Sequence, residues 1–260
     1  MTLTPESTLI AVEIHDRVAT VRLNRPHKLN AVTQEMSNDL IRIIAGINDD
    51  PTIRAVVYTG TGRAFCAGSD ISTLDQYTTP WQFRNRRDYC DALRECRKPV
   101  IAAVNGYAFG GGLEAALTCD IRLAADSATF AAPEVKLGWI GGGGMSPLLT
   151  NSIGPSNAAT MLMTGDPIDA SQALAWGMIS QSLPAADLLD TAQALAATIA
   201  ARPPIAVETA KANLRAAQNL PLDGAIGYER ELQAITFATD DATEGRAAFA
   251  QKRAGTFHGH

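Results

Sequence analysis

The chain has 260 residues, carries a formal net charge of −5 and is 46% hydrophobic in composition. Its length suits one large domain or a domain with a smaller appendage, and its acidic balance argues against nucleic-acid binding. The longest apolar runs, such as 100–104 and 192–201, are shorter than the roughly 20 residues that a membrane-spanning helix needs. Because no secretory signal is visible at the start, we expect a cytoplasmic protein outside any membrane.

The first half of the chain alternates strand and helix patterns. Short β-branched or apolar runs predict strands, at residues 9–14, 18–23, 53–59, 100–104, 121–125 and 128–131. Apolar residues at helical spacing predict helices between them, at residues 33–48, 81–96 and 113–119. Thr33 is a plausible N-cap of the first helix, and a glycine-rich turn at 105–112 precedes the last. Such alternation is typical of an α/β domain.

From about Gly154 onward the pattern becomes helical. Helices are predicted at residues 156–163, 170–176, 185–201, 205–217, 222–237 and 244–253. The pair Pro203 and Pro204 separates the last three from the rest. Because three helices can hardly bury their apolar faces alone, we expect them to pack on the main domain or on another subunit.

The cysteines and histidines give no sign of a metal centre. The four cysteines form no CxxC pair and have no histidine nearby, which also argues against a disulfide framework. The histidines lie near the two ends of the chain, at His15, His27, His258 and His260. We therefore expect neither a metal ligand set nor a histidine-dependent catalytic triad.

Two glutamates stand beside glycine-rich turns, in GGGLE at 110–114 and in APEVKLG at 132–138. Two carboxylates that converge on one pocket can divide proton donation and water activation between them. Each has an ordinary alternative. Glu114 would complement the dipole at the start of a helix, and Glu134 would be an exposed turn residue after Pro133.

Two segments could supply backbone N–H groups to an oxyanion hole. The segment RAFCAGSDI at 63–71 follows a predicted strand, and Gly111 stands where a helix begins and N–H groups lack intrahelical partners. Such donors would stabilise charge that develops on a carbonyl oxygen. The alternative for both segments is a tight turn in which glycine permits close packing.

These motifs resemble those of the enoyl-CoA hydratase/isomerase, or crotonase, superfamily, most closely the enoyl-CoA hydratases. The resemblance extends over nearly the whole chain, through NRPHKLNA at 24–31, RAFCAGSDI at 63–71, KPVIAAVNGYAFGGGLE at 98–114, FAAPEVKLG at 130–138, TGDPIDA at 164–170 and FATDDATEGRAAFAQKR at 237–253. It implies a crotonase (ClpP-like) α/β spiral of ββα units over residues 1–200. It also implies a C-terminal helical trimerisation region over 201–260, which would form a homotrimer or a dimer of trimers.

The resemblance also implies a reaction and its residues. The N–H groups of Ser69 and Gly111 would form the oxyanion hole for an acyl-CoA thioester. Water would add to a trans-2-enoyl-CoA to give a 3-hydroxyacyl-CoA, with Glu114 activating the water and Glu134 supplying the proton at the α-carbon. No metal or redox cofactor is implied, because coenzyme A is part of the substrate. Isomerase relatives commonly keep only the second carboxylate, so the pair favours hydration.

Contacts with coenzyme A and the acyl chain are implied for a larger set of residues: Lys28, Ala67, Asp70, Trp139, Lys252 and Phe257. The last two would reach a neighbouring subunit's ligand. The segment 74–89 varies in the family and lines the acyl tunnel. The stretch GWIGGGGM at 138–145 departs from the family pattern, which leaves the acyl preference open.

Three other functions stay open at this point. One is a different crotonase reaction, such as enoyl-CoA isomerisation or dehydration of a specialised hydroxyacyl-CoA. A second is RNA binding, which some relatives show, although this acidic chain lacks a lysine-rich helical stripe. A third is dinucleotide binding, suggested by VVYTGTG at 56–62, which lacks the GxGxxG spacing.

Overall fold

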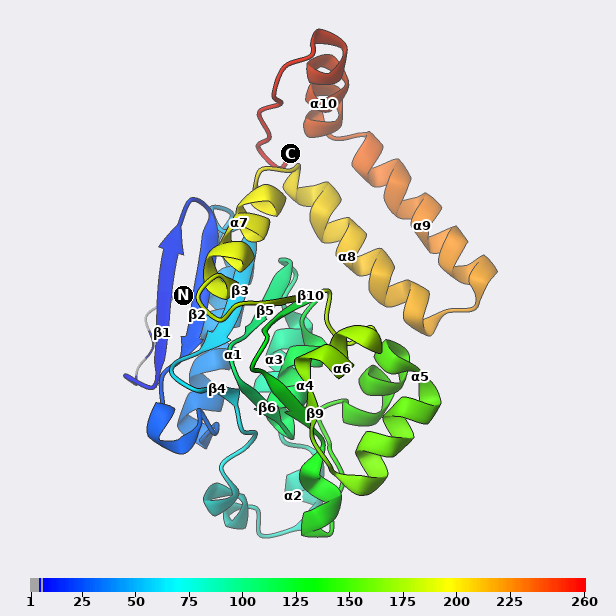
Figure 1. Cartoon of the computed structure of the whole chain (residues 1–260). Coiled ribbons are helices and arrows are strands. Elements are labelled where there is room, and N and C mark those ends of the chain that lie inside the picture. Colours follow the sequence, from blue (N-terminus) through cyan, green and yellow to red (C-terminus); the bar gives the residue numbers. More distant parts are fainter. Residues whose placement is uncertain (1–4, 6) are drawn as a thin grey trace.

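Two β-sheets form the centre of the molecule in the computed structural model, which describes residues 5 and 7–260 (Figure 1). The larger sheet has the strand order β1-β2-β3-β5-β7-β10. Its strands are β1 (Ile10–His15), β2 (Val18–Leu23), β3 (Ala55–Gly60), β5 (Val100–Val104), β7 (Ile121–Ala125) and β10 (Gln181–Leu183). The pair β1 and β2 is an antiparallel hairpin, and the other neighbours run parallel.

The smaller sheet has the order β4-β6-β8-β9. Its strands are β4 (Ala64–Cys66), β6 (Tyr107–Phe109), β8 (Thr129–Ala131) and β9 (Ile168–Asp169). Each of the pairs β3–β4, β5–β6 and β7–β8 gives one strand to each sheet and is followed by helix, which is the predicted arrangement of ββα units. Because parallel strands β4, β6 and β8 end at one edge, the segments that follow them meet there.

The first helix, α1 (Gln34–Asp49), begins as predicted. The side chain of Thr33 accepts a hydrogen bond from the backbone N–H of Met36, which satisfies a donor that the helix itself cannot pair. One face of α1 is buried, with Leu40 and Ile47 fully enclosed in the core. Burial of each such side chain stabilises the fold by about 1.5–3 kcal/mol.

The single helix predicted at 81–96 is wrong, because the structure has two helices there. They are α2 (Pro80–Arg84) and α3 (Tyr89–Glu95). The carboxylate of Asp88 accepts hydrogen bonds from the N–H groups of Cys90 and Asp91, and the side chain of Asp91 bonds back to the N–H of Asp88. This capping box starts a new helix and leaves the residues before it, including Arg86, outside any helix.

The other helices up to residue 200 are α4 (Gly111–Thr118), α5 (Met145–Thr164), α6 (Ala170–Ala175) and α7 (Leu188–Ala200), together with the 3-10 helices η1 (Pro26–Lys28), η2 (Ile71–Gln76) and η3 (Pro133–Leu137). Gly154 has non-helical backbone angles inside α5, directly before Pro155. The predicted helix at 156–163 therefore corresponds to the second half of a longer, kinked element. Helix α7 packs on strands β2, β3, β5 and β7.

Helices α8 (Pro204–Asn219), α9 (Leu222–Phe237) and α10 (Asp240–Gln251) extend from this core, and α8 and α9 lie side by side (Figure 1). Buried Lys211 of α8 donates to the carbonyl oxygen of Lys98 at 2.7 Å and pairs with Asp120 at 2.7 Å. These contacts fix α8 to the sheet. None of the helices in the described part of the chain combines the length and apolar composition of a membrane-crossing segment.

Candidate active site

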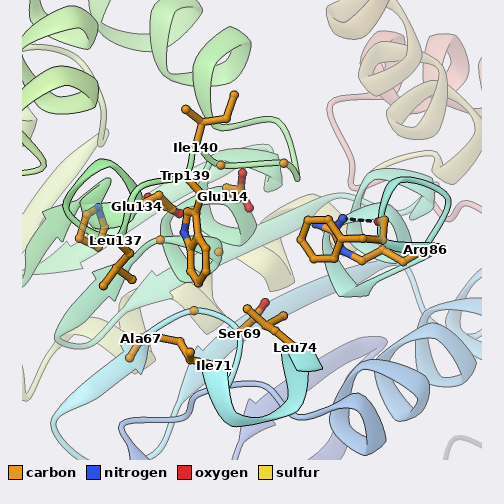
Figure 2. Close-up of a pocket in the computed structure, with 17 residues that line it drawn as sticks. Ala67, Ser69, Ile71, Leu74, Arg86, Glu114, Glu134, Leu137, Trp139 and Ile140 are labelled. Atoms are coloured by element: carbon orange, nitrogen blue, oxygen red, sulfur yellow. Dashed lines mark hydrogen bonds between the residues drawn. The ribbon is translucent and has the colours of Figure 1, made fainter. Parts of the chain in front are cut away.

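One pocket brings together Ser69, Gly111, Glu114 and Glu134 (Figure 2). Ser69 follows β4, Gly111 and Glu114 lie on α4 directly after β6, and Glu134 lies on η3 after β8. One part of the site thus follows each of the neighbouring strands β4, β6 and β8 of the smaller sheet. The topology explains how residues so far apart in the sequence converge.

The backbone N–H of Ser69 points away from its neighbouring chain segment. Val32 donates its N–H to the carbonyl oxygen of Gly68 at 2.8 Å and accepts a hydrogen bond from the N–H of Asp70 at 2.8 Å. In this parallel bridge the N–H of Ser69 faces the opposite side, and no described residue accepts it. Arg25 holds the loop by pairing with Asp70 at 2.7 Å.

Gly111 supplies a second unpaired N–H at the start of α4. It is the first residue of the helix, and none of the residues that the structure describes accepts its N–H. The two amides are close neighbours, because a Cβ atom placed on Gly111 would lie 3.6 Å from the nitrogen of Ser69. A Cβ on Gly68 would lie 3.2 Å from the nitrogen of Gly111, and Gly68 has a positive φ of 100°. Glycine at 68 thus permits this close approach.

Glu114 is almost fully buried, with 6% of its surface exposed. Its Oε1 atom accepts hydrogen bonds from the backbone N–H groups of Gly143 at 2.8 Å and Met145 at 3.2 Å. Burial raises the pKa of Glu114, and these two N–H groups act in the opposite direction because they stabilise the carboxylate. The side chain is therefore a desolvated carboxylate held in one orientation.

The run of four glycines wraps the backbone around Glu114. A Cβ atom on Gly141 would lie 2.7 Å from Oε1 of Glu114, and one on Gly143 would lie 2.7 Å from Oε2. Real side chains do not approach so closely. Glycine at these two positions thus lets the loop reach the carboxylate with its N–H groups.

Glu134 is half-buried and lacks comparable support. Its Oε2 atom is buried and has no hydrogen-bond partner among the described residues. Burial raises the pKa of Glu134, its own backbone N–H acts in the opposite direction, and the nearby charge of Glu114 adds to the increase. Because an unpartnered buried oxygen favours the neutral acid, this carboxyl group is suited to carry a proton.

We expect Gly143→Ala to lower kcat by about 10²-fold, the size of effect that a misplacement of roughly 1 Å produces. The added Cβ would collide with Glu114 and lie 3.1 Å from Cys90, while the backbone at 143 is otherwise compatible with alanine. Gly227→Ala on α9 is the matched control, because a Cβ at this position meets nothing within 4 Å. Steady-state kinetics of both variants that showed equal losses would contradict this role.

Of the six residues predicted to contact coenzyme A or the acyl chain, two line the pocket and four do not. Ala67 and Trp139 line the pocket, and the indole of Trp139 lies near the middle of the view in Figure 2. Four residues are not in the pocket wall of this chain: Lys28 on η1, Asp70 beside Arg25, Lys252 at the end of α10, and Phe257, whose carbonyl oxygen accepts from Arg54 at 2.7 Å. Their contacts with coenzyme A stay predictions.

Two residues of the site lie in the segment 74–89, which the resemblance assigned to the acyl tunnel, but the sequence did not single them out. Arg86 lines the pocket, but the sequence offers three nearby arginines, at 84, 86 and 87, and no signal that selects one. Tyr89 is buried, and its hydroxyl lies 3.4 Å from Oγ of Ser69 and packs on Gly111. Within the described residues, no group of His, Cys, Asp and Glu side chains is arranged to hold a metal ion.

Two unpaired N–H groups and two carboxyl groups around one pocket suit an enzyme that carries out acid/base chemistry next to a carbonyl group. Comparison with known proteins specifies the class. The sequence profile of the family described as enoyl-CoA hydratase/isomerase matches residues 13–260. The chain therefore belongs to the enoyl-CoA hydratase/isomerase family, as the motifs predicted.

Individual relatives match over nearly the full length. A probable enoyl-CoA hydratase of Mycobacterium bovis is 41% identical over 251 residues, covering 95% of this chain and 97% of that protein. The mitochondrial enoyl-CoA hydratase of Pongo abelii is 38% identical, covering 94% of this chain and 84% of that protein. A crystal structure of an enoyl-CoA hydratase subunit from Geobacillus kaustophilus has a TM-score of 0.91 at 34% identity, covering 98% of this chain and 100% of that chain. The predicted α/β crotonase fold is confirmed, whereas trimer formation stays a prediction.

Proposed function

We propose that this protein is an enoyl-CoA hydratase, a hydro-lyase that adds water to trans-2-enoyl-CoA thioesters. The observation that carries the proposal is the pair of carboxyl groups, Glu114 and Glu134, in one pocket with the free N–H groups of Ser69 and Gly111. Full-length relatives that are named enoyl-CoA hydratases support it. Coenzyme A enters as part of the substrate, and the proposed steps use no metal or redox cofactor.

The oxyanion hole binds the thioester oxygen. As water adds at the β-carbon, negative charge moves through the α-carbon onto this oxygen, and the N–H groups of Ser69 and Gly111 stabilise it. Both donors are fixed before the substrate binds, Ser69 by the bridge of its neighbours to Val32 and Gly111 by the start of α4. Preorganised donors of this kind are worth far more in a water-excluded site than in solution.

The two carboxyl groups carry the protons. Glu114, whose carboxylate is supported by two backbone N–H groups, takes a proton from the attacking water. Glu134, with its unpartnered buried oxygen, donates a proton to the α-carbon of the enolate. One C–O and one C–H bond form, the C=C double bond becomes single, and the product is a 3-hydroxyacyl-CoA. Proton exchange with solvent then restores the starting protonation states.

We expect kcat/KM to fall on the acid side at a pH above the ordinary glutamate pKa of 4.5. Burial raises the pKa of both glutamates, and protonation of the base Glu114 removes the group that accepts the proton from water. Activity is therefore lost as the pH falls through this raised value. A pH profile of kcat/KM reports the macroscopic values of the coupled pair, and an acid limb at or below pH 4.5 would contradict the assignment.

The direct test is hydration of crotonyl-CoA, followed as loss of the enoyl thioester absorbance and confirmed by mass spectrometry of the product. A gain of one water and formation of 3-hydroxybutyryl-CoA is the expected result. No hydration across a series of chain lengths would exclude the proposal. Conversion of a 3-enoyl-CoA to the 2-enoyl-CoA without hydration would instead support the isomerase reaction.

Trimer formation through residues 201–260 belongs to the same proposal. Large apolar side chains of α9 and α10 are exposed in the single chain, among them Leu222, Phe237 and Phe249. Contact with neighbouring subunits would cover them. Light scattering is expected to give a trimer or a dimer of trimers, and a monomer would contradict this arrangement.

A further inference from the structure

Arg86 is the one cationic side chain in the pocket wall of the described chain. Three contacts hold its guanidinium group. Nη1 donates to the carbonyl oxygen of Phe83 at 2.7 Å, Cζ lies 4.1 Å from the centre of the Phe83 ring, and Nε lies 3.5 Å from Oδ2 of Asp88. Figure 2 shows Arg86 across the pocket from Leu137, with Trp139 between them. The group is therefore preorganised rather than free to rotate.

One edge of this guanidinium is left open. Nη2 has no hydrogen-bond partner among the residues described, and it lies beside Gly142, where a Cβ atom would be only 3.1 Å away. The side chain is 22% exposed, so little water reaches it compared with a surface arginine. Glycine at 142 leaves the space beside Nη2 that a ligand atom needs.

An ordinary structural role explains Arg86 less well. The ion pair with Asp88 uses only Nε, and its 3.5 Å separation is longer than a hydrogen bond of normal strength. Asp88 is already engaged through Oδ1, which caps α3. The pair thus orients the guanidinium but leaves the N–H groups of Nη2 unused. A neutral acyl chain that filled the pocket would remove water from them without replacing its hydrogen bonds, which is unfavourable.

The remaining walls determine what kind of ligand fits. Ile71, Leu74 and Phe83 are apolar and suit the methylene groups of an acyl chain. The carboxylate of Glu114, in the same pocket, repels an anion, and Arg86 is the one wall residue of the described chain whose charge attracts one. A negatively charged chain end would therefore be directed to one position.

We propose that Arg86 binds a carboxylate carried by the acyl chain, so that the preferred substrates are trans-2-enoyl-CoA thioesters with a second, remote carboxylate. The inference rests on the proposed hydratase function and names its substrate class. The carboxylate accepts from Nη2 while the thioester oxygen lies at Ser69 and Gly111. A hydrogen bond between a guanidinium group and a carboxylate is roughly twice as strong as one between neutral groups. Replacing the carboxylate of the substrate by a neutral group should therefore weaken binding measurably.

The test compares matched substrates. A series of trans-2-enoyl-CoA thioesters of increasing length ends either in a carboxylate or in the uncharged carboxamide of the same shape. We expect kcat/KM to favour the carboxylate by about 10- to 100-fold at the length that reaches Arg86. Arg86→Gln should reduce this ratio to near one. Arg87→Gln is the control, because Arg87 is exposed and pairs with Glu95, outside the pocket.

The outcomes separate the two proposals. Hydration of crotonyl-CoA with no preference for carboxylate at any length overturns the role of Arg86 and leaves the hydratase function standing. A preference that Arg86→Gln leaves unchanged also overturns it, because a merely structural arginine would alter kcat/KM for both partners of a pair equally. Absence of hydration of every thioester, crotonyl-CoA included, excludes the proposed function itself and with it this inference.

Discussion

Glu134→Gln should lower kcat for crotonyl-CoA hydration by about 10²- to 10⁴-fold, the usual contribution of a positioned acid/base group. Glutamine keeps the shape of the side chain but cannot deliver a proton to the α-carbon. Glu114→Gln should cause a loss of similar size, because its Oε1 can still accept from Gly143 and Met145 while the group that takes the proton from water is gone. Stopped-time assays with high enzyme concentration measure both residual rates.

Folding should survive these substitutions. Since burial raises the pKa of Glu134 in the folded state, this carboxyl group makes folding less favourable as the pH rises from its ordinary pKa of 4.5 through the raised value. An amide is free of this penalty, so the melting temperature of Glu134→Gln at neutral pH should equal or exceed that of the parent. Glu13→Gln, at an exposed position on β1, is the matched control with unchanged kcat. Near-normal turnover of either active-site variant would remove that carboxyl group from the mechanism.

Elements with strong local signals were predicted accurately. Strands β5 and β7 and helix α9 have the predicted bounds, since each has a continuous or periodic apolar pattern and clear breaks at both ends. In the smaller sheet, β8 was predicted at 128–131, but β4, β6 and β9 have only two or three residues each and were not predicted, because they are too short for a pattern to show. The break between α2 and α3 within 81–96 could have been predicted from the sequence. Asp88 and Asp91 form a capping box, but the apolar spacing on both sides continues across it.

For the active site, too, only features with a local sequence signal could be predicted. Motifs identified Glu114, Gly111, Ser69 and Glu134 as candidates, but their convergence depends on the parallel pairing of β4, β6 and β8, which no local pattern encodes. Arg86 is a clearer case. Its place in the pocket wall follows from the break between α2 and α3, so a sequence reading that continued the helix could not separate it from the neighbouring arginines.

Gly111→Ala should lower kcat by about 10²- to 10³-fold, as the loss of one oxyanion-hole donor does. A Cβ atom at this position would overlap with the hydroxyl oxygen of Tyr89, and this tyrosine is almost fully buried. Either the start of α4 or the tyrosine must move, and the N–H of residue 111 then no longer points to the thioester oxygen. The backbone at Gly111 has no positive φ, so alanine is otherwise acceptable there.

A second substitution separates this steric effect from general damage. Tyr89→Phe removes the overlapping oxygen, and the next contact of the new Cβ is Cζ of residue 89 at 3.3 Å, which a small shift of the ring can relieve. The double variant Gly111→Ala with Tyr89→Phe should therefore regain part of the lost kcat. Gly227→Ala, where a Cβ meets nothing within 4 Å, should leave kcat unchanged. Wild-type turnover in a correctly folded Gly111→Ala protein would show that the N–H of residue 111 does not stabilise the enolate. A loss that Tyr89→Phe cannot relieve would show that the steric explanation is wrong.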